Sequence, residues 1–462
     1  MPGIIKNIFA TTVTMDSSQH WDRWKIRRSI LALGVPLIIG ELGSICQQFA
    51  DTMMVGHHST EELAAAGFIN SIFYFVIFLT LGMSYASTPL IASAFGRKDN
   101  TSVIRILCES LIVNILVGLF FVLVLLGFLL NLDLFNQPSE IIDFAKRYFV
   151  WIIASVPFMT LFNGLKQYMD GIGRTQTSMW VLIASNVLNI GLNIILIWGF
   201  LGFPQLGLVG AGISTFFARL FQVSVLGYIV YNSKYRKEIK SNSDKGLVRP
   251  TYKGVLHQIK IGIPISVQLG LEIATFNVCG IFMGWLGAIP LAAHQAMFTI
   301  STLCFQVLYG FGSAGSILIS QFRGVGQWDN IKRISYQTFL INLSFVTVII
   351  FIICVFFKYF AILLTNDEQV INVMWAILPW FVLYQLGDCT QITFANALRG
   401  IEKTIPLMTI AFVAYVIISM PFSYYFAFIK DYGFHGVWAG IPFGLSTAGL
   451  LFWIAFRKYT KK

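Results

Sequence analysis

The chain has 462 residues, of which 56% are hydrophobic and only 11% are charged, and its formal net charge is +11. Soluble globular domains carry about 25% charged residues, and a soluble chain of this length divides into domains with polar surfaces. The composition therefore all but excludes a soluble protein and predicts a polytopic membrane protein. The basic excess alone would suggest an acidic partner such as nucleic acid. Whether it indicates such a partner depends on where the basic residues lie along the chain.

Twelve apolar windows follow one another along the chain, each close to the roughly 20 residues that a membrane-spanning helix needs. Long apolar runs such as residues 115–130 do not alternate as a membrane β-barrel requires. We therefore predict an all-α polytopic membrane protein with twelve transmembrane helices. The windows cover roughly residues 29–55, 65–93, 104–130, 143–166, 177–200, 207–231, 256–284, 290–320, 335–364, 371–397, 404–428 and 434–456.

One long polar stretch divides the windows into two sets of six. The predicted organisation is a cytoplasmic N-terminal segment at 1–28, an N-lobe at 29–231, a cytoplasmic linker at 232–254, and a C-lobe with a short cytoplasmic tail at 255–462. The linker is basic, but nucleic-acid binding would need basic and aromatic side chains on a folded surface. No nucleic-acid partner is therefore expected.

The basic residues predict the topology. With the N-terminus in the cytoplasm, 27 of the 32 Lys and Arg residues fall on the cytoplasmic side, four fall outside, and Arg219 lies within a span. Basic residues concentrate in cytoplasmic loops. The count therefore predicts that both termini lie in the cytoplasm. We also expect the chain to be a monomer in the lipid bilayer of the cell's inner (plasma) membrane.

The two halves of the sequence resemble each other at a shift of 228–230 residues. Six spans per repeat is an even number, so the halves enter the membrane from the same side. Many transporters are built from such repeats, with the substrate site at the repeat interface, and transport is therefore the leading class. The matches pair Pro36 with Pro264, 63–67 with 291–295, Gly82 with Gly312, 96–100 with 326–330, Gly171 with Gly400, and 209–213 with 437–441.

Four acids lie within predicted spans: Glu41, Asp51, Glu272 and Asp388. An ionised side chain at the bilayer centre costs at least about 2.5–3.5 kcal/mol, so each needs a reason. Deep carboxylates exchange a cation or a proton, or meet a cationic substrate. The alternative is a carboxylate paired with a neighbouring helix, and for Glu41 the two interpretations weigh equally.

Three further charged residues have simpler interpretations. Glu109 and Asp170 lie near predicted cytoplasmic ends, where they can reach the interface. Arg219 can pair with one of the buried acids.

Two sets of uncharged side chains extend the candidate site. Asn189 and Asn193 are one turn apart on the fifth span and share a face, so their carbonyls can complete a hard-cation site beside a carboxylate. Hydrogen bonding between helices explains such asparagines equally well. Tyr384 is one turn before Asp388, and its ring suits an organic cation; ordinary packing is the alternative.

Other patterns carry no function. The sequence GFGSAG at 310–315 lies inside a span, with no strand before it. His294 has no second histidine at metal-ligand spacing and is interpreted as a packed side chain. The six cysteines are scattered and form no CxxC pair. Because no HExxH, GxSxG or P-loop is present, neither an enzyme nor a cofactor is predicted.

Several segments resemble the multidrug and toxic compound extrusion (MATE) transporters, and in particular their NorM-like branch. The resemblance covers nearly the whole chain. In the first half it rests on Pro36 through ADTMMVG (50–56) and on the LAA that follows; in the second half it rests on GIPISVQLGLE (262–272), LAAHQ (291–295) and DCTQITFANALRG (388–400).

The resemblance implies antiport, in which an inward Na+ or H+ gradient drives the export of bulky, often cationic xenobiotics. It implies cation-coupling roles, and Na+ ligation if Na+ is the ion, for Asp51, Asn189, Asn193, Glu272 and Asp388. Substrate contacts are expected from Tyr384, Asp388, Glu272 and Glu41, although Glu41 lies outside the family pattern. Another branch has an acid at the Asn193 position and lacks the acids of the C-lobe, the opposite of this sequence.

Two alternatives stay open. A lipid-linked oligosaccharide flippase of the same superfamily would line its cavity with basic residues, whereas the deep charges here are mostly acidic. A membrane-embedded enzyme would need a nucleophile with a base, or a set of metal ligands, and none is evident.

Overall fold

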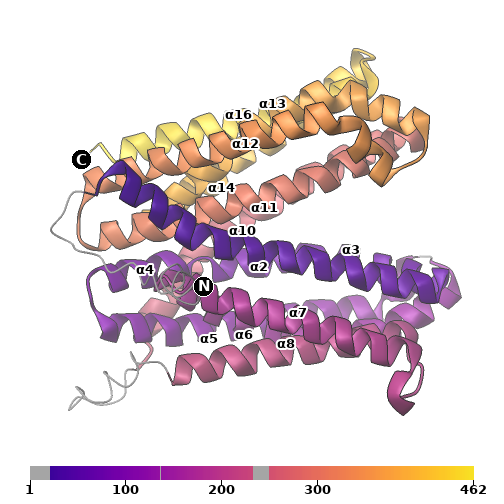
Figure 1. The fold of residues 1–462 in the computed structure, drawn as a ribbon, viewed down its shortest axis with the longest axis horizontal. Coiled ribbons are helices and arrows are strands. Elements are labelled where there is room, and N and C mark those ends of the chain that lie inside the picture. Colours follow the sequence, from indigo (N-terminus) through magenta and orange to yellow (C-terminus); the bar gives the residue numbers. More distant parts are fainter. Residues whose placement is uncertain (1–20, 136, 233–248, 462) are drawn as a thin grey trace, which may run out of the picture. The chain divides into compact units, whose positions relative to one another are not determined.

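The computed structural model describes residues 21–135, 137–232 and 249–461, and within these ranges the secondary structure is helical (Figure 1). Twelve of the described helical segments are long and apolar enough to cross a membrane, which confirms the predicted fold class. Most of the predicted N-terminal segment 1–28 and of the predicted linker 232–254 lies outside the described residues.

Each half of the chain forms six spans. The first half contains α2 (Arg23–His58), α3 (Thr60–Ser84), α4 (Ser87–Gly96), α5 (Asn100–Leu130), η1 (Leu132–Phe135), α6 (Ser139–Gly171), α7 (Thr175–Trp198), η2 (Phe200–Gly202) and α8 (Gly207–Tyr231). The second half contains α10 (Tyr252–Trp285), α11 (Ala288–Gly324), α12 (Trp328–Leu364), α13 (Glu368–Gly400), α14 (Ile405–Ala411), η3 (Phe412–Ser419), α15 (Met420–Tyr424), η4 (Tyr425–Ile429) and α16 (Gly433–Tyr459).

Three spans are not single regular helices, and one of them is α12, which has non-helical backbone angles at Phe356. The second span breaks at Tyr85 and Ala86 into α3 and α4. The eleventh span contains the π-helical turns η3 and η4 on either side of α15. Pro421 in α15 has no amide hydrogen to donate and its ring crowds the preceding turn. Wider turns beside such a proline let the remaining backbone groups pair within the span.

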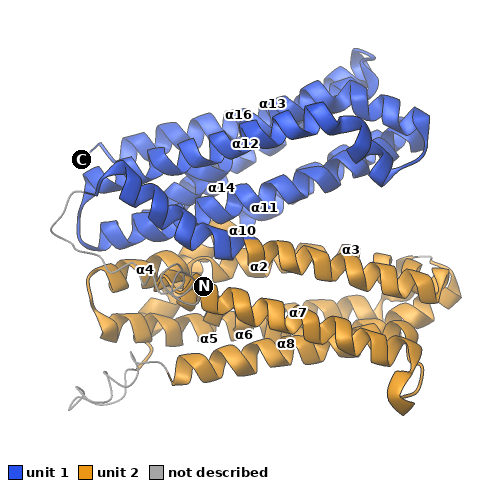
Figure 2. Ribbon diagram, viewed as in Figure 1, with its two compact units in different colours: residues 1–38, 267–462 blue, residues 39–266 orange. Residues whose placement is uncertain are grey.

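The chain forms two compact units (Figure 2). Unit 2 contains residues 39–266, and unit 1 contains residues 267–462 together with the chain before residue 39. The chain passes from one unit to the other inside α2 and again inside α10. Each crossing lies two residues after a proline, Pro36 or Pro264, and these are the two prolines that the internal repeat aligns.

The internal repeat is visible in matching contacts within each unit. A Cβ atom on Gly171 would lie 2.9 Å from Ile91, and a Cβ atom on Gly400 would lie 2.8 Å from Ile319. Each glycine lies where two helices pack closely, and the two helix pairs are equivalent in the repeat: α4 with α6 in unit 2, and α11 with α13 in unit 1. Both pairs therefore need a residue without a side chain at this position.

Close helix packing in unit 1 predicts a large effect for Gly436→Ala. The new methyl group would collide with the backbone of Phe426 and Ala427, and overpacking of this kind costs about 1–3 kcal/mol. We expect a lower apparent melting temperature of the purified protein in detergent. The matched control is Gly191→Ala in α7, where no atom lies within 4 Å of the new methyl group; its melting temperature should stay equal or rise. Equal destabilisation by both substitutions would contradict this packing.

Candidate functional site

The first candidate site lies in unit 2, where α2 faces α7. The Asn193 side-chain amide donates to Asp51 Oδ1 at 2.5 Å, and Gln47 Nε2 donates to Asp51 Oδ2 at 3.4 Å. The same Asn193 amide lies 3.3 Å from Asn189 Oδ1. The structure thus brings together the three residues that the sequence predicted for this site, and it adds Gln47, one turn before Asp51.

Asp51 opens onto a cavity of about 230 Å³ that is lined by α2, α3, α6 and α8. Arg219 lines the same cavity, donates to Ser155 Oγ at 2.6 Å and lies 5.0 Å from the ring centre of Phe73. Arg219 forms no direct ion pair with a carboxylate among the described residues, but its charge and that of Asp51 attract each other across this cavity. A hydroxyl group and an aromatic face hold the guanidinium.

The oxygen-rich surroundings of Asp51 suit a small, hard cation. Asn193 Oδ1 is buried without a hydrogen-bond partner. Hard cations prefer carboxylate and carbonyl oxygens. No cluster of three His, Cys, Asp or Glu side chains occurs in the described ranges, so a cation here would use one carboxylate and amide oxygens.

The second candidate site lies in unit 1, around Glu272 on α10. Glu272 Oε2 accepts hydrogen bonds from Gln268 Nε2 at 2.9 Å and from Gln391 Nε2 at 3.1 Å. The Gln391 amide also donates to the Tyr415 hydroxyl at 3.0 Å. Glu272 is 6% exposed, so this carboxylate is buried among neutral carboxamides.

Arg399 acts on Glu272 through Gln268. Its Nη2 atom donates to Gln268 Oε1 at 2.6 Å, and its Nη1 atom donates to the Tyr309 hydroxyl at 2.9 Å. A guanidinium group only donates hydrogen bonds. It therefore holds the carbonyl oxygen of Gln268 and leaves the NH2 group of that amide to face Glu272.

Asp388 on α13 is completely buried, and it forms no ion pair among the described residues. The charge of Glu272 acts on Asp388, and the hydroxyl of Tyr384, one turn earlier on α13, is the hydrogen-bond donor that interacts with it. The Tyr384 ring is itself buried and packs edge-on against Phe276 at 5.7 Å. An ionised carboxylate without an ion pair is very costly in such a place, so Asp388 needs a proton or a bound cation.

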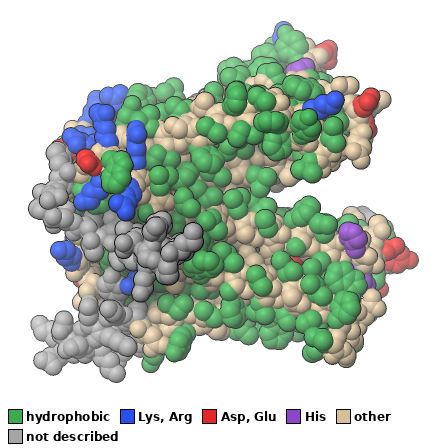
Figure 3. Space-filling view, viewed as in Figure 1, with side chains coloured by type: hydrophobic (Ala, Val, Ile, Leu, Met, Phe, Trp, Pro, Cys, Tyr) green, Lys and Arg blue, Asp and Glu red, His purple; other side chains and the backbone are tan. Residues whose placement is uncertain are grey.

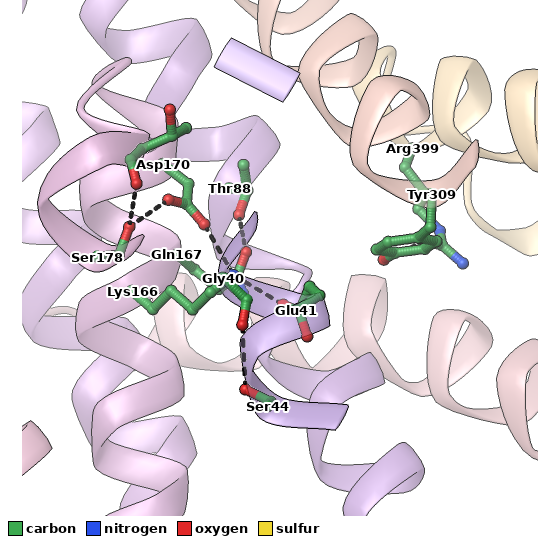
Figure 4. Close-up of polar contacts among 11 residues, drawn as sticks. Gly40, Glu41, Ser44, Thr88, Lys166, Gln167, Asp170, Ser178, Tyr309 and Arg399 are labelled. Atoms are coloured by element: carbon green, nitrogen blue, oxygen red, sulfur yellow. Dashed lines mark hydrogen bonds and ion pairs between the residues drawn. The ribbon is translucent and has the colours of Figure 1, made fainter. Parts of the chain in front are cut away.

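Glu41 belongs to a separate network in unit 2 (Figure 4). Lys166 Nζ lies 3.4 Å from Glu41 Oε1 and 3.1 Å from Asp170 Oδ2, and Ser178 Oγ donates to Asp170 Oδ1 at 2.8 Å. The ion pair with Lys166 favours the packing interpretation of Glu41. Its expected contact with substrate stays a prediction.

The expectation that Glu109 and Asp170 reach the membrane interface is wrong, because each is only 3% exposed. Asp170 is held by Lys166, as described. Glu109 Oε1 accepts from the backbone nitrogen of Thr251 at 2.9 Å and from its hydroxyl at 2.7 Å. This carboxylate therefore satisfies donors at the start of α10.

Sequence reasoning did not identify five residues of these sites, and only some of them left a usable signal in the sequence. Gln47 and Gln268 each lie four residues before an acid on the same helix, a spacing that brings side chains into contact. That spacing was a usable signal. Gln391, Arg399 and Tyr415 contact the Glu272 network from other helices, so no spacing in the sequence indicated them.

Twelve membrane-spanning segments, an internal repeat and carboxylates within the helical units form the architecture of a membrane transporter. The chain belongs to the MatE family, whose model matches residues 36–195 and 264–425, one segment in each half.

The similar proteins extend over almost the whole chain. A probable multidrug resistance protein NorM from Rhizobium meliloti (strain 1021) is 30% identical over 447 residues, which cover 93% of each chain. A multidrug resistance protein MdtK from Edwardsiella ictaluri (strain 93-146) is 27% identical and covers 94% of this chain and 96% of its own.

Solved structures share the fold. An outward-facing multidrug resistance MATE family transporter of the MOP superfamily has a TM-score of 0.84 at 18% identity, covering 94% of this chain and 96% of that chain. A MOP superfamily transporter from Pyrococcus furiosus has a TM-score of 0.83 at 20% identity and the same coverage.

The Glu41–Lys166–Asp170 network predicts a large loss of stability for Lys166→Met. Removing one partner of a buried ion pair leaves a buried charge uncompensated and costs about 3–5 kcal/mol. The apparent melting temperature should fall clearly and recover in part in the double variant Lys166→Met/Asp170→Asn. The control is Lys146→Met, whose partner Asp133 is 68% exposed, so its loss should stay below about 1 kcal/mol. A similar effect of both single substitutions would contradict the role given to the network.

Proposed function

We propose that this chain is a secondary active antiporter that exports bulky, often cationic drugs or toxic compounds in exchange for Na+ or H+ by alternating access. The observation that carries the proposal is the pair of acid sites within the helical units, the half-buried Asp51 in unit 2 and the buried Glu272 with Asp388 in unit 1. Their partners are carboxamides and hydroxyl groups, which can reorient when a cation or proton arrives. The names of the relatives, which describe multidrug resistance proteins, support the same class of substrate.

Ion coupling follows from the cost of carboxylates that have no ion-pair partner. A cation or proton that neutralises Asp51 or Asp388 removes the penalty of a buried charge. A ligand shifts a conformational equilibrium only through its different affinities for the two states. Binding of the coupling ion therefore favours whichever state buries these acids more deeply, and a cationic substrate that competes for the same carboxylates favours release of the ion.

The surface of unit 1 supports the predicted orientation. On the face drawn in Figure 3, hydrophobic side chains cover the lengths of the helices, and the Lys and Arg side chains of unit 1 gather mainly at the end where the C-terminus lies. Arg457 and Lys458 in the last turn of α16 belong to this end. We infer that this end faces the cytoplasm, in the inner membrane.

The flippase alternative is less well supported. A phosphate-bearing lipid would be met by a predominantly basic cavity, whereas the cavity beside Asp51 contains one basic residue, Arg219, and one acid. The unit 1 site combines two acids with one arginine.

Neutralising the candidate acids should abolish coupling. In inverted membrane vesicles with ethidium as the fluorescent cation, Asp51→Asn, Glu272→Gln and Asp388→Asn should each reduce gradient-driven ethidium transport by about tenfold or more. Na+ and pH gradients are imposed separately, so the gradient that drives transport in the wild type identifies the ion. The matched control is Glu140→Gln, an exposed acid in the first turn of α6, which should behave as the wild type.

Two results would overturn the proposal. Ethidium movement that needs no gradient in the wild type would remove the antiport mechanism. Unchanged gradient-driven transport in all three variants, with equal amounts of protein in the membrane, would remove these acids as the coupling sites.

The topology has its own test. A green fluorescent protein fused after Lys462 should fluoresce, because it folds in the cytoplasm, whereas alkaline phosphatase at the same position should stay inactive, because it needs export. Fusions inside the η2 segment, between α7 and α8, should give the opposite result. Active phosphatase at the C-terminus would reverse the proposed orientation.

A further inference from the structure

A basic patch lies at the end of unit 1 where α2 and α12 both begin (Figure 1). On the face drawn in Figure 3, basic side chains gather at this end of the unit. The first two turns of the two helices contribute Arg23, Lys25, Arg27, Arg28, Lys332 and Arg333. The charge bias that orients a membrane protein requires basic residues on one side, but it requires no particular arrangement of them. The arrangement of these side chains therefore points to a further role.

One hydrogen bond joins the two helices within the basic patch. Arg27 Nε donates to Oε1 of the buried Gln337 at 2.6 Å. A guanidinium group donates in a fixed plane, so this bond orients Arg27 and leaves its two Nη atoms for another acceptor. Arg23 and Arg333 each lie four residues before one member of the pair, on the same helix faces and one turn nearer the end of unit 1. Three guanidinium groups therefore line one seam between α2 and α12.

The acids of the same helix turns do not neutralise this seam. Among the described residues, none of its three arginines has a carboxylate within ion-pair distance, although Asp329 lies one turn before Arg333. Asp22 accepts a hydrogen bond from the backbone nitrogen of Lys25 at 2.7 Å, and it thereby satisfies a free donor at the start of α2. The seam therefore keeps an excess of positive charge.

Two aromatic side chains next to the seam indicate the level of the membrane surface. Trp24 is 66% exposed, with the Arg28 guanidinium 5.4 Å from the centre of its ring, and Tyr336 is 58% exposed. Trp and Tyr side chains of membrane proteins concentrate at the level of the lipid headgroups. The arginines of the seam lie within one turn of these rings along α2 and α12, so they lie at the level of the lipid phosphates.

The face of α2 that carries Arg23 and Arg27 becomes apolar further along the helix. At the same four-residue spacing it continues with Leu31 and Val35, and both side chains are exposed. Residues at this spacing form one stripe on a helix. A stripe of two guanidinium groups followed by two aliphatic side chains matches the order of groups in a phospholipid, in which a phosphate precedes the acyl chains.

We propose that Arg23, Arg27 and Arg333 bind the phosphate of an anionic phospholipid in the seam between α2 and α12, with its acyl chains along the apolar part of the α2 stripe. Guanidinium groups bind phosphate through paired, charge-assisted hydrogen bonds. A headgroup with a net negative charge fits the excess positive charge of the seam, whereas phosphatidylethanolamine brings an ammonium group that the arginines repel. The site goes beyond the proposed antiport, because it needs neither the coupling acids nor a gradient. A failure of either proposal therefore leaves the other standing.

The test is native mass spectrometry of the full-length chain, which is purified in detergent, freed of lipid and titrated with phosphatidylglycerol or with phosphatidylethanolamine of the same acyl chains. Wild-type protein should bind the first phosphatidylglycerol about tenfold more tightly than the first phosphatidylethanolamine. The double variant Arg23→Gln/Arg333→Gln leaves the hydrogen bond between Arg27 and Gln337 in place, and it should lose most of this preference. Its binding of phosphatidylethanolamine should change little.

The matched control is Arg457→Gln/Lys458→Gln, which removes the same amount of charge from exposed positions in the last turn of α16 and should keep the wild-type preference. Melting temperatures confirm that each variant is folded. Inorganic phosphate should not displace the lipid, because the acyl chains contribute to binding. The proposal is overturned if the wild type binds both lipids equally, if the folded Arg23→Gln/Arg333→Gln variant keeps the preference, if the control loses as much of it, or if inorganic phosphate displaces the lipid.

Discussion

Hydrocarbon cannot hydrate a polar group, and this constraint decides how the charged side chains of the chain are held. Most acids inside the helical units have fixed partners. Glu62 accepts from the backbone nitrogen of Leu208 at the start of α8 and contacts His58. Glu109 holds the start of α10 in the same way, and Lys166 serves both Glu41 and Asp170. Such acids join helices, and each is satisfied by a backbone donor or a full positive charge.

The candidate coupling acids differ in the kind of partner they have. Asp51 and Glu272 accept from carboxamides, whose orientation can change without moving a charge, and Asp388 forms no ion pair in the described residues. A carboxylate fixed by an ammonium group has little to gain from a proton or a metal ion. A carboxylate held by amides keeps most of its need for a counter-charge, so these three acids remain available to an ion.

The duplication preserved packing more strictly than it preserved polarity. Gly171 and Gly400 make equivalent close contacts in the two units. The acids of the two candidate sites do not lie at equivalent positions of the repeat. At a shift of 228 residues, Asp51 falls on Cys279 and Glu272 falls on Ser44. Helix pairs of the same geometry impose the same steric demand in both units, whereas the acids have different hydrogen-bond partners in each unit.

The sequence by itself determined the membrane class, the twelve spans, the repeat and the three candidate coupling acids, because apolar length and misplaced charge are local properties of the chain. Spacing along one helix could also have indicated Gln47 and Gln268. Only the tertiary structure decided which acids have fixed partners. It assigned Lys166 to Glu41, brought Arg399 to Gln268, and left Asp388 without an ion pair among the described residues, because these relations depend on side chains from different helices.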